Sequence, residues 1–305
     1  MRRRDLLQAA GLLAAAPATL AWGAEGSAAA PAYDWRSLRF GGGGFIDGFV
    51  FHPGERGLLY CRTDIGGAYR FEPATRRWQP LLDHLGRADA DLMGVLSLAV
   101  DPSDADRVYA ACGLYTGAWA RGAALLASAD RGATWRVHEL GLKLLGNGPG
   151  RGSGERLQVD PNRPERLLLG SSQDGLLRSD DRGQRFAPLA GFPARHVSLV
   201  LFDPKSGRPG QGSQTIYVGA HDQPGLFVST DAGQRFTRVA GLPAQAPQRA
   251  AFGADGSLYV SFAAGAPGAV VNPSYASTGS VWRRAPDGRW QDITPLRPDA
   301  AQPFG

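Results

Sequence analysis

Short apolar stretches separated by turn-forming residues recur along the chain from about residue 45 onward. Five of them end in Asp-Pro or a similar turn, in the segments FVFHP, LAVDP, LQVDP, VLFDP and AAFGADG. A second apolar stretch follows each one, in GLLYCRTD, RVYAACG, RLLLGSS, TIYVGA and SLYVSF. Apolar runs bounded by turn formers are typical of strands buried in packed sheets. The pattern predicts five four-stranded units between about Phe45 and Thr294.

One eight-residue motif occurs three times, as SADRGATW (Ser128–Trp135), SDDRGQRF (Ser179–Phe186) and STDAGQRF (Ser229–Phe236). The copies start 51 and 50 residues apart, and a fixed period of this size is typical of repeat architectures. Ser and Asp can bond nearby backbone N–H groups, Gly supplies a left-handed residue, and the closing aromatic side chain packs into the core. The motif resembles the Asp-box of sialidase-like β-propellers, and we interpret its three aspartates as scaffold.

The predicted fold is an all-β propeller of four-stranded blades with Asp-box turns. In this topology the loops between the second and third strands of a blade, and the loops between blades, lie on one face. The Asp-boxes, between the third and fourth strands, lie on the other face. Function is therefore expected where the first class of loop departs from the repeat.

The first thirty residues differ from the rest. A basic start, Arg2 to Arg4, is followed by an apolar run to about Leu20 and by small residues to Ala30, which is typical of a secretory signal. The string RRDLL resembles a twin-arginine signal. A membrane helix is the competing interpretation, but the run is short and interrupted by Pro17. We expect a signal peptide and a short linker in residues 1–30, an N-terminal propeller truncated in its sixth blade in 31–305, and a mature protein that is periplasmic or extracellular.

The formal net charge of +5 comes from arginines scattered along the chain, and no basic run predicts nucleic-acid binding. Five scattered histidines form no metal-ligand motif, so neither a metal nor another cofactor is expected. Export permits a disulfide between Cys61 and Cys112, but two buried free thiols are the favoured interpretation. We expect a monomer with no membrane attachment after signal cleavage.

The first blade carries the leading catalytic candidate. It has no Asp-box, and its hairpin RTDIGGAYR places Asp64 on the loop face, in a turn with Gly66 and Gly67. Two adjacent glycines allow the backbone to approach a ligand closely. The alternative is that Asp64 only caps its own hairpin, a common role for Asp.

Two other loops of the same face carry candidate binding residues. The hairpin CGLYTGAWARG places Tyr115 and Trp119 among polar and Gly residues, where exposed aromatic rings can stack on sugars. The entry to the third blade, NGPGRGSGERL, contains Asn147, Arg151 and Glu155. A structural Arg–Glu pair that braces this loop is the alternative to a binding role.

Several segments together resemble glycoside hydrolase family 74, the xyloglucan-active β-glucanases. They are RFGGGGFIDGFVFHP, LYCRTDIGGAYRF, DLMGVLSLAVDP, YTGAW, NGPGRGSGERL and TIYVGA, and the similarity covers residues 33–305. The resemblance implies the N-terminal one of two seven-bladed propellers, with a polysaccharide cleft between them. It also implies inverting hydrolysis of a β-1,4-glucan backbone, with Asp64 as the catalytic base and Tyr115, Trp119, Asn147, Arg151 and Glu155 along the cleft.

The chain departs from the family in two places. The stretch FPARHVSLV is shorter than is usual there, and the last residues, QPFG, resemble a sixth blade cut in mid-strand. The resemblance places the general-acid aspartate in a second propeller that this sequence does not contain. Asp47, Glu155 and Asp222 are the nearest substitutes for that acid, although none lies in a family acid motif.

Two other functions remain open. A propeller that binds glycan or protein without catalysis is consistent with the missing acid. A sialidase shares the Asp-boxes, but no Arg-Ile-Pro-like segment precedes the first of them.

Overall fold

The computed structural model describes residues 40–265, 270, 272 and 275–295. All of the strands lie in the compact unit that begins at Leu38. The expected signal in residues 1–30 and the expected start of a sixth blade lie outside the described residues. No helix in the described part of the chain is long and apolar enough to cross a membrane.

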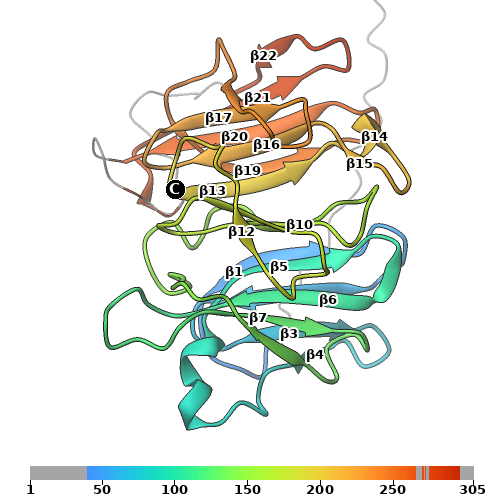
Figure 1. The fold of residues 1–305 in the computed structure, drawn as a ribbon, viewed down its shortest axis with the longest axis vertical. Coiled ribbons are helices and arrows are strands. Elements are labelled where there is room, and N and C mark those ends of the chain that lie inside the picture. The colour runs from blue at the N-terminus through green and yellow to red at the C-terminus, as the bar shows by residue number, and fades with distance from the viewer. Residues whose placement is uncertain (1–39, 266–269, 271, 273–274, 296–305) are drawn as a thin grey trace, which may run out of the picture. The chain divides into compact units, whose positions relative to one another are not determined.

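The described residues form five four-stranded antiparallel sheets, which follow one another along the chain as blades (Figure 1). This confirms the predicted all-β propeller arrangement. The strands of the blades, in chain order, are β1 (Ile46–Phe51), β2 (Leu59–Thr63), β3 (Ala68–Glu72) and β4 (Arg77–Pro80); β5 (Val95–Asp101), β6 (Asp104–Cys112), β7 (Ala124–Ser128) and β8 (Arg136–Glu139); β9 (Leu157–Val159), β10 (Leu167–Gly170), β11 (Leu176–Ser179) and β12 (Ala187–Pro188); β13 (Val197–Phe202), β16 (Ile216–Ala220), β17 (Gly225–Ser229) and β18 (Thr237–Arg238); β19 (Ala246–Phe252), β20 (Leu258–Ala264), β21 (Thr278–Arg284) and β22 (Trp290–Asp292).

The hydrophobic core lies between successive blades. One cluster joins Tyr60 of β2 to Leu98 of β5 and Leu126 of β7. Equivalent clusters join the second blade to the third, the third to the fourth and the fourth to the fifth. The first strands β5 and β13 each contribute buried apolar residues to two of these clusters, which explains why they appear in the sequence as short continuous apolar runs.

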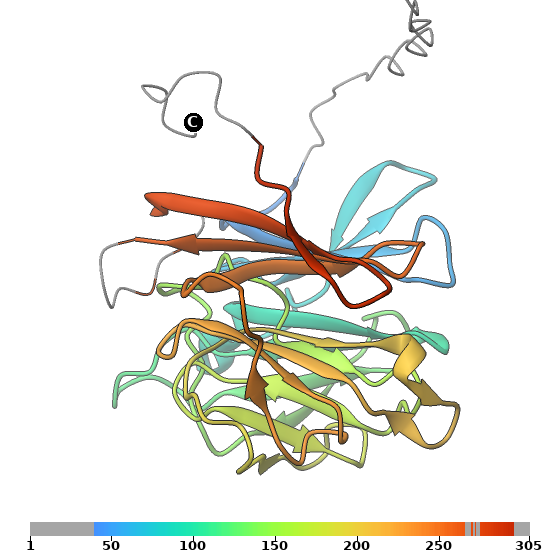
Figure 2. The same ribbon diagram turned by 90° about the horizontal axis from the view of Figure 1, so that it is seen from above.

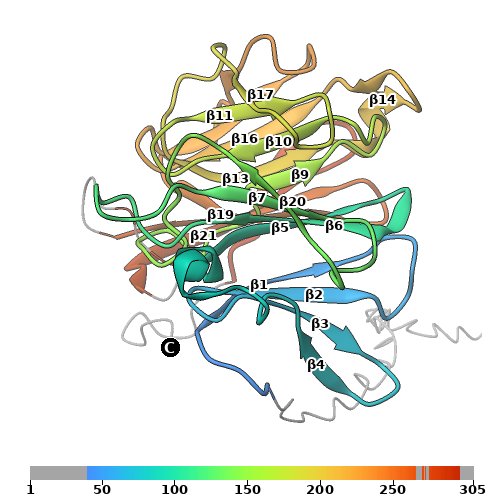
Figure 3. The same ribbon diagram turned by 60° about the horizontal axis from the view of Figure 1, so that its bottom comes forward.

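The first and fifth blades also meet (Figure 2). The Arg249 guanidinium of β19 donates a hydrogen bond to the Asp47 carbonyl of β1. No ladder of hydrogen bonds joins these two sheets within the described ranges. Figure 3 shows β1 and β2 from another side, with β5 close to β1.

The three Asp-box turns have the same hydrogen bonds. In the second blade, Ser128 Oγ donates to Asp130 Oδ1 and accepts from the Gly132 N–H, and Asp130 Oδ1 accepts from the Thr134 N–H. The turns at Ser179 and Ser229 repeat this arrangement. The closing aromatic residues pack against three successive interblade clusters. The Asp-box aspartates are therefore bound within their own turns, as predicted for scaffold.

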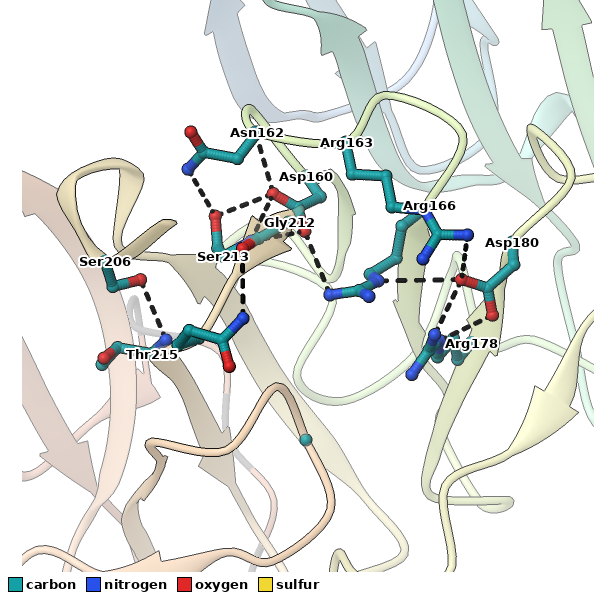
Figure 4. A network of polar contacts seen from close by, with 12 residues as sticks. Asp160, Asn162, Arg163, Arg166, Arg178, Asp180, Ser206, Gly212, Ser213 and Thr215 are labelled. Atoms are coloured by element: carbon teal, nitrogen blue, oxygen red, sulfur yellow. Dashed lines mark hydrogen bonds and ion pairs between the residues drawn. The ribbon is translucent and has the colours of Figure 1, made fainter. Parts of the chain in front are cut away.

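The fourth blade carries an extra hairpin, β14 (Gly207–Arg208) and β15 (Gly212–Ser213), after the short 3-10 helix η2 (Pro204–Ser206). The buried Asp160 carboxylate holds it to the third blade (Figure 4). Asp160 Oδ1 accepts from Ser213 Oγ at 2.7 Å, and Arg166 Nη1 lies 3.3 Å from Oδ2. This network joins the third and fourth blades through the connections that follow their first strands.

Both cysteines are buried and unpaired in the described part of the chain, as expected. Burial raises the pKa of the Cys61 thiol to about 12. The thiol therefore stays protonated at neutral pH.

The Asp130 turn predicts a pH dependence of stability. The hydrogen bond from the Thr134 hydroxyl, with further bonds from the Thr134 N–H and Ser128, lowers the pKa of Asp130 to about 2. Because the pKa is lower in the folded protein, the stabilisation is complete above the unfolded value of about 3.9 and is lost as the pH falls towards 2. We expect Asp130→Asn to lower the melting temperature at pH 6, with the difference from wild type narrowing below pH 3.

Thermal unfolding followed by circular dichroism measures this difference. Asp174→Asn is a matched control, because the described residues show no hydrogen bond or ion pair of the Asp174 carboxylate. If the melting temperature of Asp130→Asn stays below that of wild type by the same amount from pH 6 to pH 2, the lowered pKa of Asp130 does not contribute to stability.

Candidate active site

Asp64 lies in the turn between β2 and β3, and it does not cap that turn. Thr63 does so: its Oγ1 accepts from the Gly66 N–H at 2.8 Å and donates to the Gly67 carbonyl at 2.9 Å. Asp64 Oδ1 instead accepts from the Phe45 N–H, at 2.7 Å, in the segment that leads into β1. The hairpin-cap interpretation is therefore wrong, because a neighbouring side chain already satisfies the turn.

The glycines around Asp64 permit a close approach of two backbone segments. A Cβ added to Gly66 would lie 1.9 Å from the Gly43 carbonyl oxygen, and one added to Gly44, whose φ is +93°, would lie 3.0 Å from Asp64 Oδ1. A larger residue at Gly44 would press on the Asp64 carboxylate, and one at Gly66 would push the two backbone segments apart. The GGGGF segment is therefore part of the site, because it delivers the N–H group that orients Asp64.

Arg151 covers the second oxygen of Asp64. Its Nε lies 3.3 Å from Asp64 Oδ2, and its guanidinium lies over the Phe45 ring at 6.0 Å from the centroid. Only 9% of the Asp64 side chain is exposed. The carboxylate is therefore nearly buried, because the segment that leads into β1 and Arg151 both lie against it.

Glu155 connects three blades around the centre of the propeller. Its Oε1 accepts from Arg62 Nε at 2.7 Å, and its Oε2 accepts from Ser97 Oγ and the Leu98 N–H at 2.7 and 2.8 Å. The side chains of Arg62 and Glu155 are 0% and 12% exposed. Glu155 thus braces its loop, and its partner is Arg62 of the first blade. A role in substrate binding stays a prediction for this residue.

The loop before β9 also reaches the aromatic hairpin of the second blade. Asn147 Nδ2 donates to the Tyr115 hydroxyl at 2.7 Å, and the Tyr115 and Trp119 rings lie 5.3 Å apart. Trp119 is 75% exposed. One loop therefore connects the Asp64 turn, through Arg151, with an exposed aromatic platform, through Asn147.

Sequence patterns missed a buried polar cluster behind this loop. Ser153 Oγ donates to Gln248 Oε1 at 2.9 Å and lies 3.1 Å from His221 Nε2, and the His196 and His221 rings are 4.9 Å apart. Burial lowers the pKa of His196 to about 4 and that of His221 to about 2, so both rings are neutral at pH 7. No motif signals this cluster, because its members come from three blades.

The three substitute acids differ in their surroundings. Asp222 accepts from the backbone N–H groups of Arg195 and His196 at 2.9 and 3.0 Å, so its carboxylate supports a loop. Both oxygens of Glu155 are also occupied. Asp47 is different: burial raises its pKa to about 6, and it lies next to Arg151.

A cavity of about 350 Å³ adjoins Asp47 and Arg151. It lies between the first and fifth blades and is also lined by Phe45, Gln248, Arg249 and Tyr275. A larger cavity, about 410 Å³, lies among Asp130 and its Asp-box neighbours and contains none of the candidate residues. The smaller cavity is the one that adjoins a buried acid, Asp47, and a candidate residue, Arg151.

The fold and this site define an Asp-box β-propeller with a cluster of buried acids and arginines at its centre. Known proteins with similar sequences are xyloglucanases. A xyloglucanase from Paenibacillus sp is 40% identical over an alignment of 320 residues, and the match covers 97% of this chain and 30% of that protein. Xyloglucanase Xgh74A from Acetivibrio thermocellus is 38% identical over an alignment of 287 residues, and the match covers 87% of this chain and 34% of that protein.

A solved structure leads to the same family. The GH74 xyloglucanase from Xanthomonas campestris superimposes with a TM-score of 0.78 at 42% identity, covering 89% of this chain and 41% of that one. No protein-family model matches the chain. The resemblance to glycoside hydrolase family 74 is confirmed: the chain is homologous to these enzymes and spans about a third of the length of the curated relatives it matches.

The Arg62–Glu155 pair predicts a large effect on stability. Glu155→Gln should lower the free energy of unfolding by about 3–5 kcal/mol, because it leaves the buried Arg62 guanidinium without a counter-charge. Urea unfolding measures the loss. Glu165→Gln breaks the half-exposed Glu165–Arg182 pair and should cost less than about 1 kcal/mol. If the free energy of unfolding falls equally in the two variants, the buried Arg62–Glu155 pair contributes no more to stability than the half-exposed pair.

Proposed function

We propose that this chain is the N-terminal part of an exported glycoside hydrolase that cleaves the β-1,4-glucan backbone of xyloglucan or a related plant glucan with inversion. The observation that carries the proposal is the placement of Asp64, in a turn capped by another residue, within a chain homologous to xyloglucanases. The proposal includes a monomeric mature protein.

The proposed role of Asp64 is that of general base. The Phe45 N–H holds Oδ1, while Oδ2 lies beside Arg151 and is the oxygen that can take a proton from an attacking water. In an inverting glycosidase, the water must fit between the base and a general acid about 6.5–9.5 Å away. We place that acid on a second propeller, since Glu155 and Asp222 are already engaged by neighbouring groups.

The proposed substrate cleft follows the loop before β9. The exposed Trp119 ring offers an apolar face on which a sugar ring can stack. Tyr115, fixed by Asn147, lies beside it with its ring tilted by 50°. Arg151 and the cavity beside it lie next to the reacting bond in this arrangement. Stacking needs only one wall of the cleft, and for this reason weak glucan binding by the 305-residue chain is expected even without turnover.

A glycan- or protein-binding propeller without catalysis is the second candidate. The observation that favours it is the engagement of Glu155 and Asp222 in structural hydrogen bonds, which leaves neither free to act as the acid. Release of product from xyloglucan, with the anomers followed by NMR, separates this candidate and the sialidase alternative from the proposed inverting enzyme.

Substitution of Asp64 tests the catalytic role. In a chain extended through a second propeller, Asp64→Asn should lower kcat by at least about 10²–10⁴-fold while substrate binding is largely kept, because the amide preserves the shape but cannot accept a proton from water. Reducing-end release and isothermal titration with xyloglucan oligosaccharides measure the two effects.

Two controls accompany this substitution. Asp174→Asn changes the aspartate in the corresponding hairpin of the third blade and should leave turnover unchanged. The 305-residue chain, assayed beside the extended one, should show little or no hydrolysis because base and acid act together. Comparable turnover by the two chains would mean that the acid lies within residues 33–305, and Asp47 would then be the first residue to change.

A further inference from the structure

Two carboxylates approach one guanidinium at the centre of the site. Arg151 Nε lies 3.3 Å from Asp64 Oδ2 and 3.7 Å from Asp47 Oδ2. Asp64 comes from the β2–β3 turn, Asp47 from β1 and Arg151 from the loop before β9. Both contacts are ionic, since Arg151 Nε has no hydrogen-bond partner among the described residues. In this one position the Arg151 charge therefore acts on both acids.

Asp47 is buried without the hydrogen bonds that usually compensate a buried carboxylate. Its side chain is 1% exposed, and neither oxygen has a hydrogen-bond partner in the described part of the chain. It lines the cavity between the first and fifth blades. An ionised group in such a place is unfavourable unless charges around it compensate. The cost of its ionisation therefore depends on the neighbouring arginines.

We propose that Asp47 is a positioning residue that shares Arg151 with Asp64 and thereby controls how strongly Arg151 neutralises the catalytic base. This inference rests on the base role proposed for Asp64. A cation held against a carboxylate favours the ionised form and so weakens it as a proton acceptor. An ionised Asp47 draws part of the Arg151 charge away and adds a like charge nearby, and both effects help Asp64 to accept a proton.

The arrangement makes the base sensitive to pH. Burial, with Asp64 as a like charge, raises the pKa of Asp47 to about 6, although arginines oppose the rise. Above about pH 6, Asp47 is mainly ionised, and both carboxylates attract the Arg151 charge. Below about pH 6, Asp47 is mainly neutral, and Asp64 is the one of the two that pairs with Arg151. The help that Asp47 gives is therefore lost as the pH falls through about 6. The charged groups that face Asp47 are Arg62 of β2, Arg151 and Asp64 beside it, Arg249 of β19, and the nearby Glu155 and Arg156.

The titration of Asp47 in the 305-residue protein tests the proposal. Aspartate labelled with ¹³C at the side-chain carboxyl is followed by NMR from pH 3 to pH 8, and the Asp47 signal is assigned by its loss in Asp47→Asn. We expect a midpoint near pH 6. Asp64→Asn should lower that midpoint by about 1 pH unit, because a like charge is removed, and Arg151→Gln should raise it by a similar amount.

Two further variants keep the test decisive. Arg151→Lys retains the charge and should leave the midpoint close to wild type, and Asp174→Asn, the matched control, should not move it. If the amide spectrum shows that Asp64→Asn is unfolded, the Asp47 midpoints in Arg151→Gln and Arg151→Lys are compared instead. A higher midpoint in Arg151→Gln than in Arg151→Lys supports the proposal, and equal midpoints overturn it. A wild-type midpoint near 3.9, or the same midpoint in wild type, Asp64→Asn and Arg151→Gln, would overturn the proposal.

The measurement is independent of turnover. If the titration of Asp47 responds to Asp64→Asn and Arg151→Gln but Asp64→Asn does not reduce hydrolysis, the proposed function is overturned. The inference that Asp47 and Asp64 share Arg151 then still holds. If the titration of Asp47 is the same in all variants but Asp64→Asn abolishes hydrolysis, only the proposed role of Asp47 is overturned.

Discussion

The hydrogen-bonded ion pair between Arg62 and Glu155 joins the blades at the centre of the propeller. Arg62 also donates to the carbonyls of Arg151 and Ser153, and Glu155 accepts from Ser97 and Leu98. The first, second and third blades are thus tied to one loop by groups almost removed from water. Because breaking a buried pair leaves an uncompensated charge, this connection constrains every residue that the loop presents, including Arg151 and Asn147.

The repeat and the site use separate parts of each blade. Interblade clusters and Asp-box turns hold the strands together, and their polar groups are satisfied within the turns themselves. The loops at the other ends of the strands are not needed for these stabilising contacts. Asp64 illustrates the division: Thr63 satisfies its turn, so the carboxylate is held by the Phe45 N–H and Arg151 from other segments of the chain. A rigid scaffold can therefore carry a site that departs from the repeat.

Electrostatics at the centre follow from the balance of buried charges. Four arginines, Arg62, Arg151, Arg156 and Arg249, surround three acids, Asp47, Asp64 and Glu155. Glu155 is saturated by hydrogen bonds, whereas Asp47 has none from the described residues. A carboxylate thus braces a loop at Glu155, is the candidate base at Asp64 and shares an arginine at Asp47, according to its hydrogen-bond donors and its burial.

The sequence by itself determined the five blades, the Asp-box turns and the placement of Asp64 on the loop face, because strand patterns and turn chemistry are local. Local pattern also explains the free thiols in buried strands. Only the tertiary structure decided that Arg62 is the partner of Glu155, that Arg151 covers Asp64, and that His221 lies against Ser153 and His196. These contacts join residues of different blades, often about a hundred positions apart, and no local period encodes such pairs. The burial of Asp47 and Asp64 belongs to the same class, since the degree of exposure depends on which segments fold over a turn.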